Sequence, residues 1–137
     1  MQLNRQVAIT ICLVFAVGVL VVASVDRVGV AQAQAEKRVE NLNTLVGTWR
    51  GERKNPQGQV QPVTLTIQEN GDLEASTPLA MLFTGKLTLA DGKMSYRTSS
   101  GIAGGPVTLH EDDKGKELLR FTNTAASPPR TVEYERQ

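Results

Sequence analysis

Short turn-forming sequences divide residues 46–137 into segments in which apolar and polar residues alternate. Asn70-Gly71 and Asp91-Gly92 accept the positive φ angles of two-residue β-hairpin loops, and Asp112-Asp113-Lys114-Gly115 indicates a slightly longer turn. Alternation with a period of two places successive side chains on opposite faces of a strand. The pattern therefore predicts an all-β fold of antiparallel strands joined in hairpin order.

Reading outward from the turns predicts eight strands with no helix between them. Their expected ranges are 46–53, 60–69, 72–77, 81–90, 93–98, 106–111, 116–123 and 130–136. One face of each strand is apolar, as with Val63, Leu65 and Ile67, and the other is polar. Such strands close most simply into an up-and-down barrel, which leaves no exposed sheet edge; a two-sheet sandwich is the alternative.

The N-terminal part of the chain has the features of a targeting segment. Residues 7–25 contain no charged side chain, and Ala31-Gln32-Ala33-Gln34-Ala35 offers two small-x-small cleavage sites. We expect residues 1–33 to be a signal peptide or, because the apolar run is long, an N-terminal membrane anchor. Residues 34–43 are then expected as a linker or short helix and residues 44–137 as one exported barrel domain, periplasmic or secreted.

The composition of the exported part excludes several kinds of site. The only cysteine, Cys12, lies in the apolar run, so a disulfide framework and a thiolate metal site are excluded from residues 34–137. From Gln34 onward the chain has 13 basic and 13 acidic residues, so its net charge is zero. We therefore expect no nucleic-acid binding, and membrane contact only through residues 7–25 if they are retained.

The first expected strand begins with a recognisable motif. Leu45-Val46-Gly47-Thr48-Trp49 resembles the start of lipocalins and calycins, whose signature is Gly-x-Trp on the first barrel strand. In that group an Arg or Lys near the end of the barrel packs across the Trp, and Arg136 matches this position by strand parity. The resemblance implies an eight-stranded barrel that binds a small apolar ligand. It extends to small bacterial members, including periplasmic metalloprotease inhibitors.

Trp49 is predicted to close one end of the barrel with Gly47 and Arg136, as a structural plug and not as a platform for a ligand. Gly47 and Gly51 share the face of Trp49, so we expect them to leave room for the indole ring. A guanidinium over that ring would add a cation–π attraction of about 1 to 2 kcal/mol.

Candidate ligand-binding residues are expected in the barrel and at its mouth. They are Leu79, Met81, Leu82, Phe83, Tyr96 and Ile102. Leu82 falls off the core face by parity. The glycine-rich segment Ser99 to Pro106 leads into a strand and not into a helix, so we interpret it as a loop at the mouth and not as a phosphate cradle.

No catalytic or metal-binding motif is recognisable. In His110-Glu111-Asp112-Asp113 consecutive side chains point to opposite faces, so a solvated hairpin turn is expected and no metal site. A single histidine and the absence of a Ser, His and Asp arrangement argue against an enzyme, and no cofactor is expected.

Two functions remain after these exclusions. The first is binding of a small apolar ligand in the barrel or at its mouth. The alternative is an envelope protein-interaction module, including a protease-inhibitor-like role, with a filled interior. An eight-stranded barrel is just wide enough for side chains or one small ligand. A cavity opening beside residues 99–106 would favour the first function.

Overall fold

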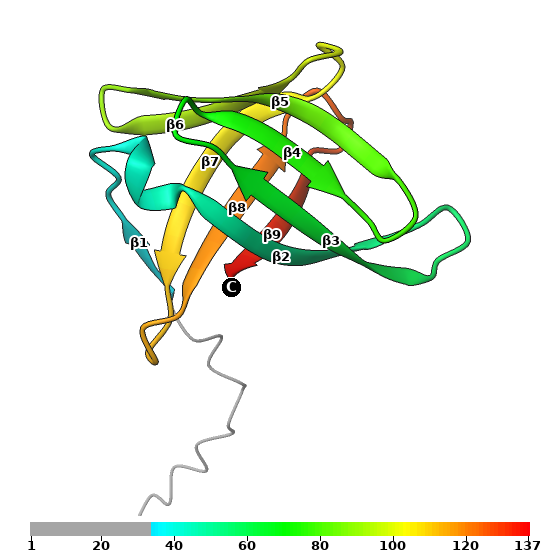
Figure 1. Cartoon of the computed structure of the whole chain (residues 1–137), viewed down its shortest axis with the longest axis horizontal. Coiled ribbons are helices and arrows are strands. Elements are labelled where there is room, and N and C mark those ends of the chain that lie inside the picture. The colour runs from blue at the N-terminus through cyan, green and yellow to red at the C-terminus, as the bar shows by residue number, and fades with distance from the viewer. Residues whose placement is uncertain (1–33) are drawn as a thin grey trace, which may run out of the picture. The chain divides into compact units, whose positions relative to one another are not determined.

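A computed structural model describes residues 34–137; the expected signal or anchor lies outside the described residues. The elements are β1 (Ala35–Lys37), the 3-10 helix η1 (Leu42–Leu45), β2 (Gly47–Lys54), β3 (Val60–Ile67), β4 (Asp72–Ser76), β5 (Met81–Ala90), β6 (Lys93–Thr98), β7 (Gly104–Glu111), β8 (Glu117–Asn123) and β9 (Arg130–Arg136) (Figure 1). Among these residues, no helix is long and apolar enough to cross a bilayer.

Strands β2 to β9 form a closed antiparallel barrel, which confirms the eight-stranded up-and-down barrel predicted from the sequence. Each strand pairs with the next along the chain, and β9 pairs back with β2 through Trp49↔Arg136, Arg50↔Glu135 and Gly51↔Tyr134. Strands β5, β6 and β9 have the predicted bounds, whereas β7 begins two residues earlier than predicted, at Gly104. The β5–β6 turn at Asp91-Gly92 has the positive φ angles, 52° and 74°, that its sequence predicts.

The core consists of inward-facing residues from all eight strands, as the alternation predicts. Trp49, Leu45, Leu65, Ala75 and Leu119 have no measurable exposure. The remaining buried apolar residues are Val39, Val63, Ile67, Leu73, Leu87, Met94, Tyr96, Val107, Leu109, Phe121 and Tyr134. Val39 and Leu45 precede β2, so the segment before the barrel also contributes to its core.

The segment before the barrel differs from its expected form. Residues 34–43, expected as a linker or short helix, contain β1 and the start of η1. β6 pairs with residues 104–107 of β7, and β1 pairs with residues 109–111 along the same strand. β1 therefore occupies the length of β7 that β6 does not reach. Its three residues are all exposed, so no hydrophobic alternation marks it in the sequence.

Two expectations drawn from the alternation are wrong, the orientation of Leu82 and the solvation of His110, and each has a local cause. The pairs Ala75↔Phe83 and Ser76↔Met81 leave Leu82 in a β-bulge, and this partly buried side chain packs against the core instead of facing away from it. His110, expected on a solvated face, is only 8% exposed and lies opposite Glu36 of β1. Its Nε2 bonds the Thr108 hydroxyl at 2.8 Å.

The up-and-down order places alternate loops at opposite ends of the barrel. The open end, toward the right of Figure 1, carries the β2–β3, β4–β5, β6–β7 and β8–β9 loops, at residues 55–59, 77–80, 99–103 and 124–129. The closed end carries the other three hairpin turns, η1 and the C-terminus. The predicted plug, Gly47, Trp49 and Arg136, lies at the closed end. The candidate ligand-binding residues lie toward the open end.

Candidate functional site

Trp49 fills the closed end of the barrel. Its indole Nε1–H donates a hydrogen bond of 2.9 Å to the carbonyl of Leu45 in η1. The guanidinium carbon of Arg136 lies 4.3 Å from the centre of the indole ring, at cation–π distance. The Arg136 guanidinium also donates to the carbonyl of Thr44. η1, the first barrel strand and the last are therefore joined at one aromatic ring.

Arg136 is held in place by a carboxylate from a third strand. Its Nε donates a hydrogen bond of 2.6 Å to Glu117, which also accepts from Lys37 of β1 at 3.1 Å. Burial would raise the pKa of the Glu117 carboxyl, but the hydrogen bonds from Arg136 and Lys37 outweigh it and hold this pKa below its usual value. The side chains at this end have partners within the fold, which is what a structural closure requires.

The glycines flanking Trp49 have different roles from the one expected. Gly47 has φ of +131°, and a Cβ there would meet nothing within 4 Å, so its role is conformational. A Cβ at Gly51 would lie 2.5 Å from the carbonyl oxygen of Glu133 and 2.7 Å from the Tyr134 ring. Gly51 therefore makes room for β9 and Tyr134, not for the indole.

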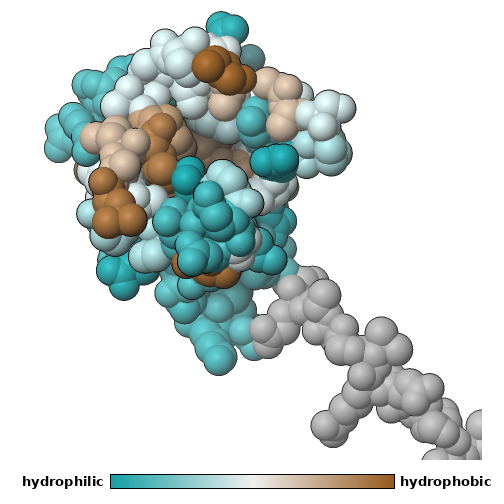
Figure 2. All heavy atoms as spheres, turned by 90° about the vertical axis from the view of Figure 1, so that its right-hand side faces the viewer, coloured by the Kyte–Doolittle hydropathy of each residue, from teal (hydrophilic) through white to brown (hydrophobic). Residues whose placement is uncertain are grey.

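A cavity of about 210 Å³ lies inside the barrel at its open end. It is lined by Phe83, Tyr96, Thr98, Ala103, Phe121, Asn123, Arg130, Val132 and Tyr134. Ala103 belongs to the glycine-rich β6–β7 loop, so the cavity reaches the segment that the sequence predicts at the mouth of the barrel. Figure 2 looks onto the open end and shows a hollow with apolar side chains around it.

Four aromatic rings form the wall of this cavity. Tyr96 and Phe121 meet edge to face with centroids 5.0 Å apart, Phe121 and Tyr134 do so at 5.4 Å, and Phe83 lies 6.5 Å from Tyr96. Within residues 34–137, neither tyrosine hydroxyl has a hydrogen-bond partner, and the Arg130 guanidinium has none either. The cavity thus combines an apolar wall with polar groups free to bind a ligand.

The tyrosines of the cavity are desolvated. Burial, with a smaller contribution from the neighbouring Tyr96, raises the pKa of Tyr134 to about 12, although the charge of Arg53 opposes the shift. Burial also raises the pKa of Tyr96. Both phenols are therefore neutral at physiological pH and can donate a hydrogen bond to a ligand.

The raised pKa of Tyr134 predicts a loss of stability in alkali. Because the folded pKa lies above the unfolded value near 10, the folded state keeps its proton longer, and stability falls as the pH rises from about 10 to 12. The expected loss from this residue is about 2 to 3 kcal/mol. Urea unfolding should show the wild type losing stability relative to Tyr134→Phe as the pH rises across this range; a difference between the two that does not change with pH would contradict the assignment.

The structure brings together only some of the residues expected to bind a ligand. Phe83 and Tyr96 line the cavity. Leu79, Met81 and Ile102 are exposed at loop tips or beside them, and Leu82 packs against the core. Sequence reasoning missed Thr98, Asn123 and Arg130 as lining residues and placed Phe121, Val132 and Tyr134 only in the core. Their shared signal is position: each lies within a few residues of an open-end loop.

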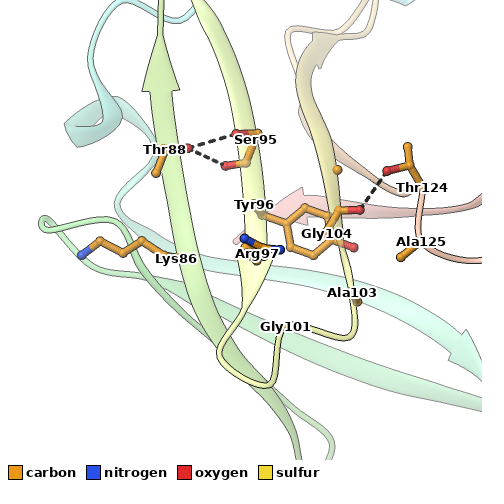
Figure 3. Close-up of a pocket in the computed structure, with 11 residues that line it drawn as sticks. Lys86, Thr88, Ser95, Tyr96, Arg97, Gly101, Ala103, Gly104, Thr124 and Ala125 are labelled. Atoms are coloured by element: carbon orange, nitrogen blue, oxygen red, sulfur yellow. Dashed lines mark hydrogen bonds between the residues drawn. The ribbon is translucent and has the colours of Figure 1, made fainter.

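A second hollow of about 630 Å³ lies on the outer surface of β5, β6 and β7 (Figure 3). Its polar side chains are largely paired with one another or with neighbours. Thr88 bonds Ser95 at 3.0 Å, Thr124 donates to the carbonyl of Gly104 at 3.2 Å, and Lys86 pairs with Asp72 at 2.9 Å. Although it is larger, this groove is open and offers fewer free groups than the inner cavity.

The fold and these two ends define a small closed antiparallel barrel with one sealed end and one hollow end. Comparison of the chain with protein-family models, with curated proteins and with solved structures finds no match. The residues of the cavity are therefore the main guide to function.

Proposed function

We propose that this domain is a non-catalytic binding protein that holds a small, mainly apolar molecule in the cavity at the open end of the barrel. The observation that supports it is the aromatic cavity of about 210 Å³ beneath the open-end loops. A barrel used only for protein contact would have no need of such a space. The resemblance of Gly47 and Trp49 to the first strand of lipocalins and calycins agrees with this function.

The size of the cavity limits the ligand. Drug-sized molecules occupy pockets of roughly 300 to 1,000 Å³, whereas an apolar cavity of about 150 Å³ accommodates benzene. The space here suits a molecule with one ring or a short branched chain, with any longer part extending through the mouth. A molecule of about ten non-hydrogen atoms would bind with a Kd on the order of 10 µM.

The free polar groups specify one further property of the ligand. Tyr96 and Tyr134 can each donate a hydrogen bond, and Arg130 adds a positive charge on the cavity wall. All three favour a ligand with an oxygen acceptor, above all a carboxylate. Among single-ring probes, we expect benzoate to bind more tightly than benzyl alcohol, and benzyl alcohol more tightly than benzene.

Filling the cavity should abolish binding. Val132 is half-buried and lines the cavity, so Val132→Phe places a ring in existing empty space. We expect benzoate affinity, measured by calorimetry, to fall at least tenfold, with no loss in the free energy of unfolding. Thr131→Phe adds the same ring on the outer face of β9, where Thr131 is exposed, and should leave affinity unchanged. Equal affinities in all three chains would eliminate the cavity as the binding site.

The proposed setting of this function is the periplasm or the cell exterior. It rests on the apolar run 7–25 and the small-x-small sites that end at Ala33 and Ala35. The fold supports the earlier site. Gln34 accepts a hydrogen bond of 3.0 Å from Arg120, and Ala35 pairs with Glu111, so cleavage after Ala33 preserves both contacts and cleavage after Ala35 removes them.

The alternative function, an envelope protein-interaction module, is supported by the exposed apolar side chains of the open-end loops. The two functions differ in what accompanies the purified protein. A small molecule seen by native mass spectrometry supports the ligand-binding proposal. A protein that is always empty and retains an envelope partner supports the alternative.

A further inference from the structure

The exposed large hydrophobic residues of the barrel all lie at its open end. Leu79 in the β4–β5 loop is 85% exposed and Ile102 in the β6–β7 loop 79%. Val60 and Met81, the first residues of β3 and β5, are 56% and 53% exposed. Figure 2, which faces this end, shows apolar side chains gathered around a hollow. Removing them from water would be favourable, and nothing within residues 34–137 covers them.

The charged residues that lie within two residues of the open-end loops are all basic. The open-end segments are residues 53–60, 76–83, 97–105 and 122–131. Together they contain four basic residues and no acidic residue, the basic residues being Arg53, Lys54, Arg97 and Arg130. Each of the four is exposed, and none makes an ion pair within the described residues.

The carboxylates lie elsewhere in the fold. The closed-end turns contain Glu69, Asp91 and Asp112, among others, and Glu52, which immediately precedes the first open-end segment, lies in the outer groove beside β9. The net charge of zero for residues 34–137 therefore conceals a separation of charge along the barrel. The four basic residues are far apart in sequence. They come to one end because alternate loops of an up-and-down barrel lie at the same end.

We propose that the open end docks on a lipid bilayer that contains anionic headgroups. The apolar tips of Leu79 and Ile102 enter the outer part of the acyl layer, while the basic side chains contact phosphate groups at the surface. This arrangement of separate apolar tips and basic residues is the one that favours binding at a membrane interface. The cavity mouth then faces the membrane.

Other partners fit these features less well. A second copy meeting mouth to mouth would bring eight unpaired cations together with no carboxylate between them, which opposes association. A protein partner would have to supply an acidic surface and several separate apolar pockets matched to loops from three hairpins. A bilayer supplies both anionic headgroups and an apolar layer without any such match.

The test uses residues 34–137, which contain the whole closed barrel and its core and are the form left by cleavage after Ala33, with a tryptophan at a loop tip. The apolar run 7–25 is then absent and cannot bind the vesicles. Ile102→Trp adds an indole at the open end, whereas native Trp49 is fully buried at the closed end and supplies a constant background. With brominated phosphatidylcholine vesicles containing phosphatidylglycerol, we expect blue-shifted and strongly quenched emission. Lys114→Trp, in the exposed β7–β8 turn, is the matched control and should not be quenched.

Charge variants then test the electrostatic part. Adding Lys54→Gln and Arg97→Gln to the Ile102→Trp chain should raise the lipid concentration for half-maximal quenching by roughly 25-fold, since each basic residue near an anionic surface contributes about fivefold. Lys93→Gln with Lys114→Gln, at the closed end, should leave it unchanged. Neither Lys54 nor Arg97 lines the inner cavity, so benzoate binding without vesicles should be unaffected.

Several results would overturn the docking proposal. They are an absence of quenching, equal quenching without phosphatidylglycerol, equal quenching of the Lys114→Trp chain, or a blue shift that appears without vesicles and grows with protein concentration. The last would indicate self-association through the open end. This inference does not depend on the proposed ligand, and a failure of benzoate binding would leave the vesicle result intact.

Discussion

Trp49→Ala is expected to lower the free energy of unfolding by about 3 to 5 kcal/mol, the usual cost of truncating a buried Trp. The side chain has no exposed surface, and its removal also deprives the Leu45 carbonyl of its indole donor and leaves Arg136 without the ring beneath it. A domain of this size has roughly 5 to 15 kcal/mol in total. The change should therefore lower the urea midpoint severely.

The measurement should follow far-ultraviolet circular dichroism, because Trp49 is the only tryptophan and its fluorescence is lost in the variant. Arg136→Gln is the partner control, and a double-mutant cycle isolates the contribution of the contact between the two side chains. Benzoate binding below the midpoint should persist, since the cavity lies at the other end. A loss of binding with stability intact would show that Trp49 is part of a ligand site.

Gly105→Ala is expected to cost about 2 to 5 kcal/mol. Gly105 has φ of +153°, and a Cβ there would lie 2.1 Å from the backbone carbonyl oxygen of Thr122 in β8. Backbone atoms cannot move aside as a flexible side chain can, so β7 and β8 would have to separate beside the cavity. The estimate combines about 1 to 2 kcal/mol for the unfavourable φ with about 1 to 3 for overpacking.

Gly101→Ala is the matched control for this prediction. Gly101 lies in the adjacent loop with φ of +73°, but a Cβ there would meet nothing within 4 Å, so only the conformational cost of about 1 to 2 kcal/mol applies. Urea unfolding of the two variants separates the effect of contact from that of conformation. Equal losses would indicate that β7 and β8 can separate at little cost.

Most of the barrel could be predicted from its turns and alternation, because half-buried strands in hairpin order leave a direct pattern in the sequence. Asp91-Gly92 is one such signal, and the strands on both sides of it have the predicted bounds. β1 could not be found in this way because its residues are all exposed. It is held by its pairing with residues 109–111 of β7, which the sequence pattern does not show. Leu82 was misassigned because a bulge interrupts the period of two.

The candidate site was only partly accessible from the sequence. Parity identifies Phe83 and Tyr96 as inward-facing, but it does not say which inward residues leave space between them. Arg130 joins the cavity because β9 begins at the open end, and the four basic residues of that end are far apart in sequence. Composition alone gave a net charge of zero, and a sum cannot report how charges are distributed on a closed surface.

The seam between β2 and β9 determines when this barrel can form. Its three residue pairs join strands from the two ends of the domain, so closure needs almost the entire chain. Domains dominated by such distant pairings fold over milliseconds to seconds. The chain loses the entropy of closing a long loop before the stabilising contacts between the two strands can form. Until then the two seam strands are unpaired edges, and this interval is when the chain is most exposed to aggregation.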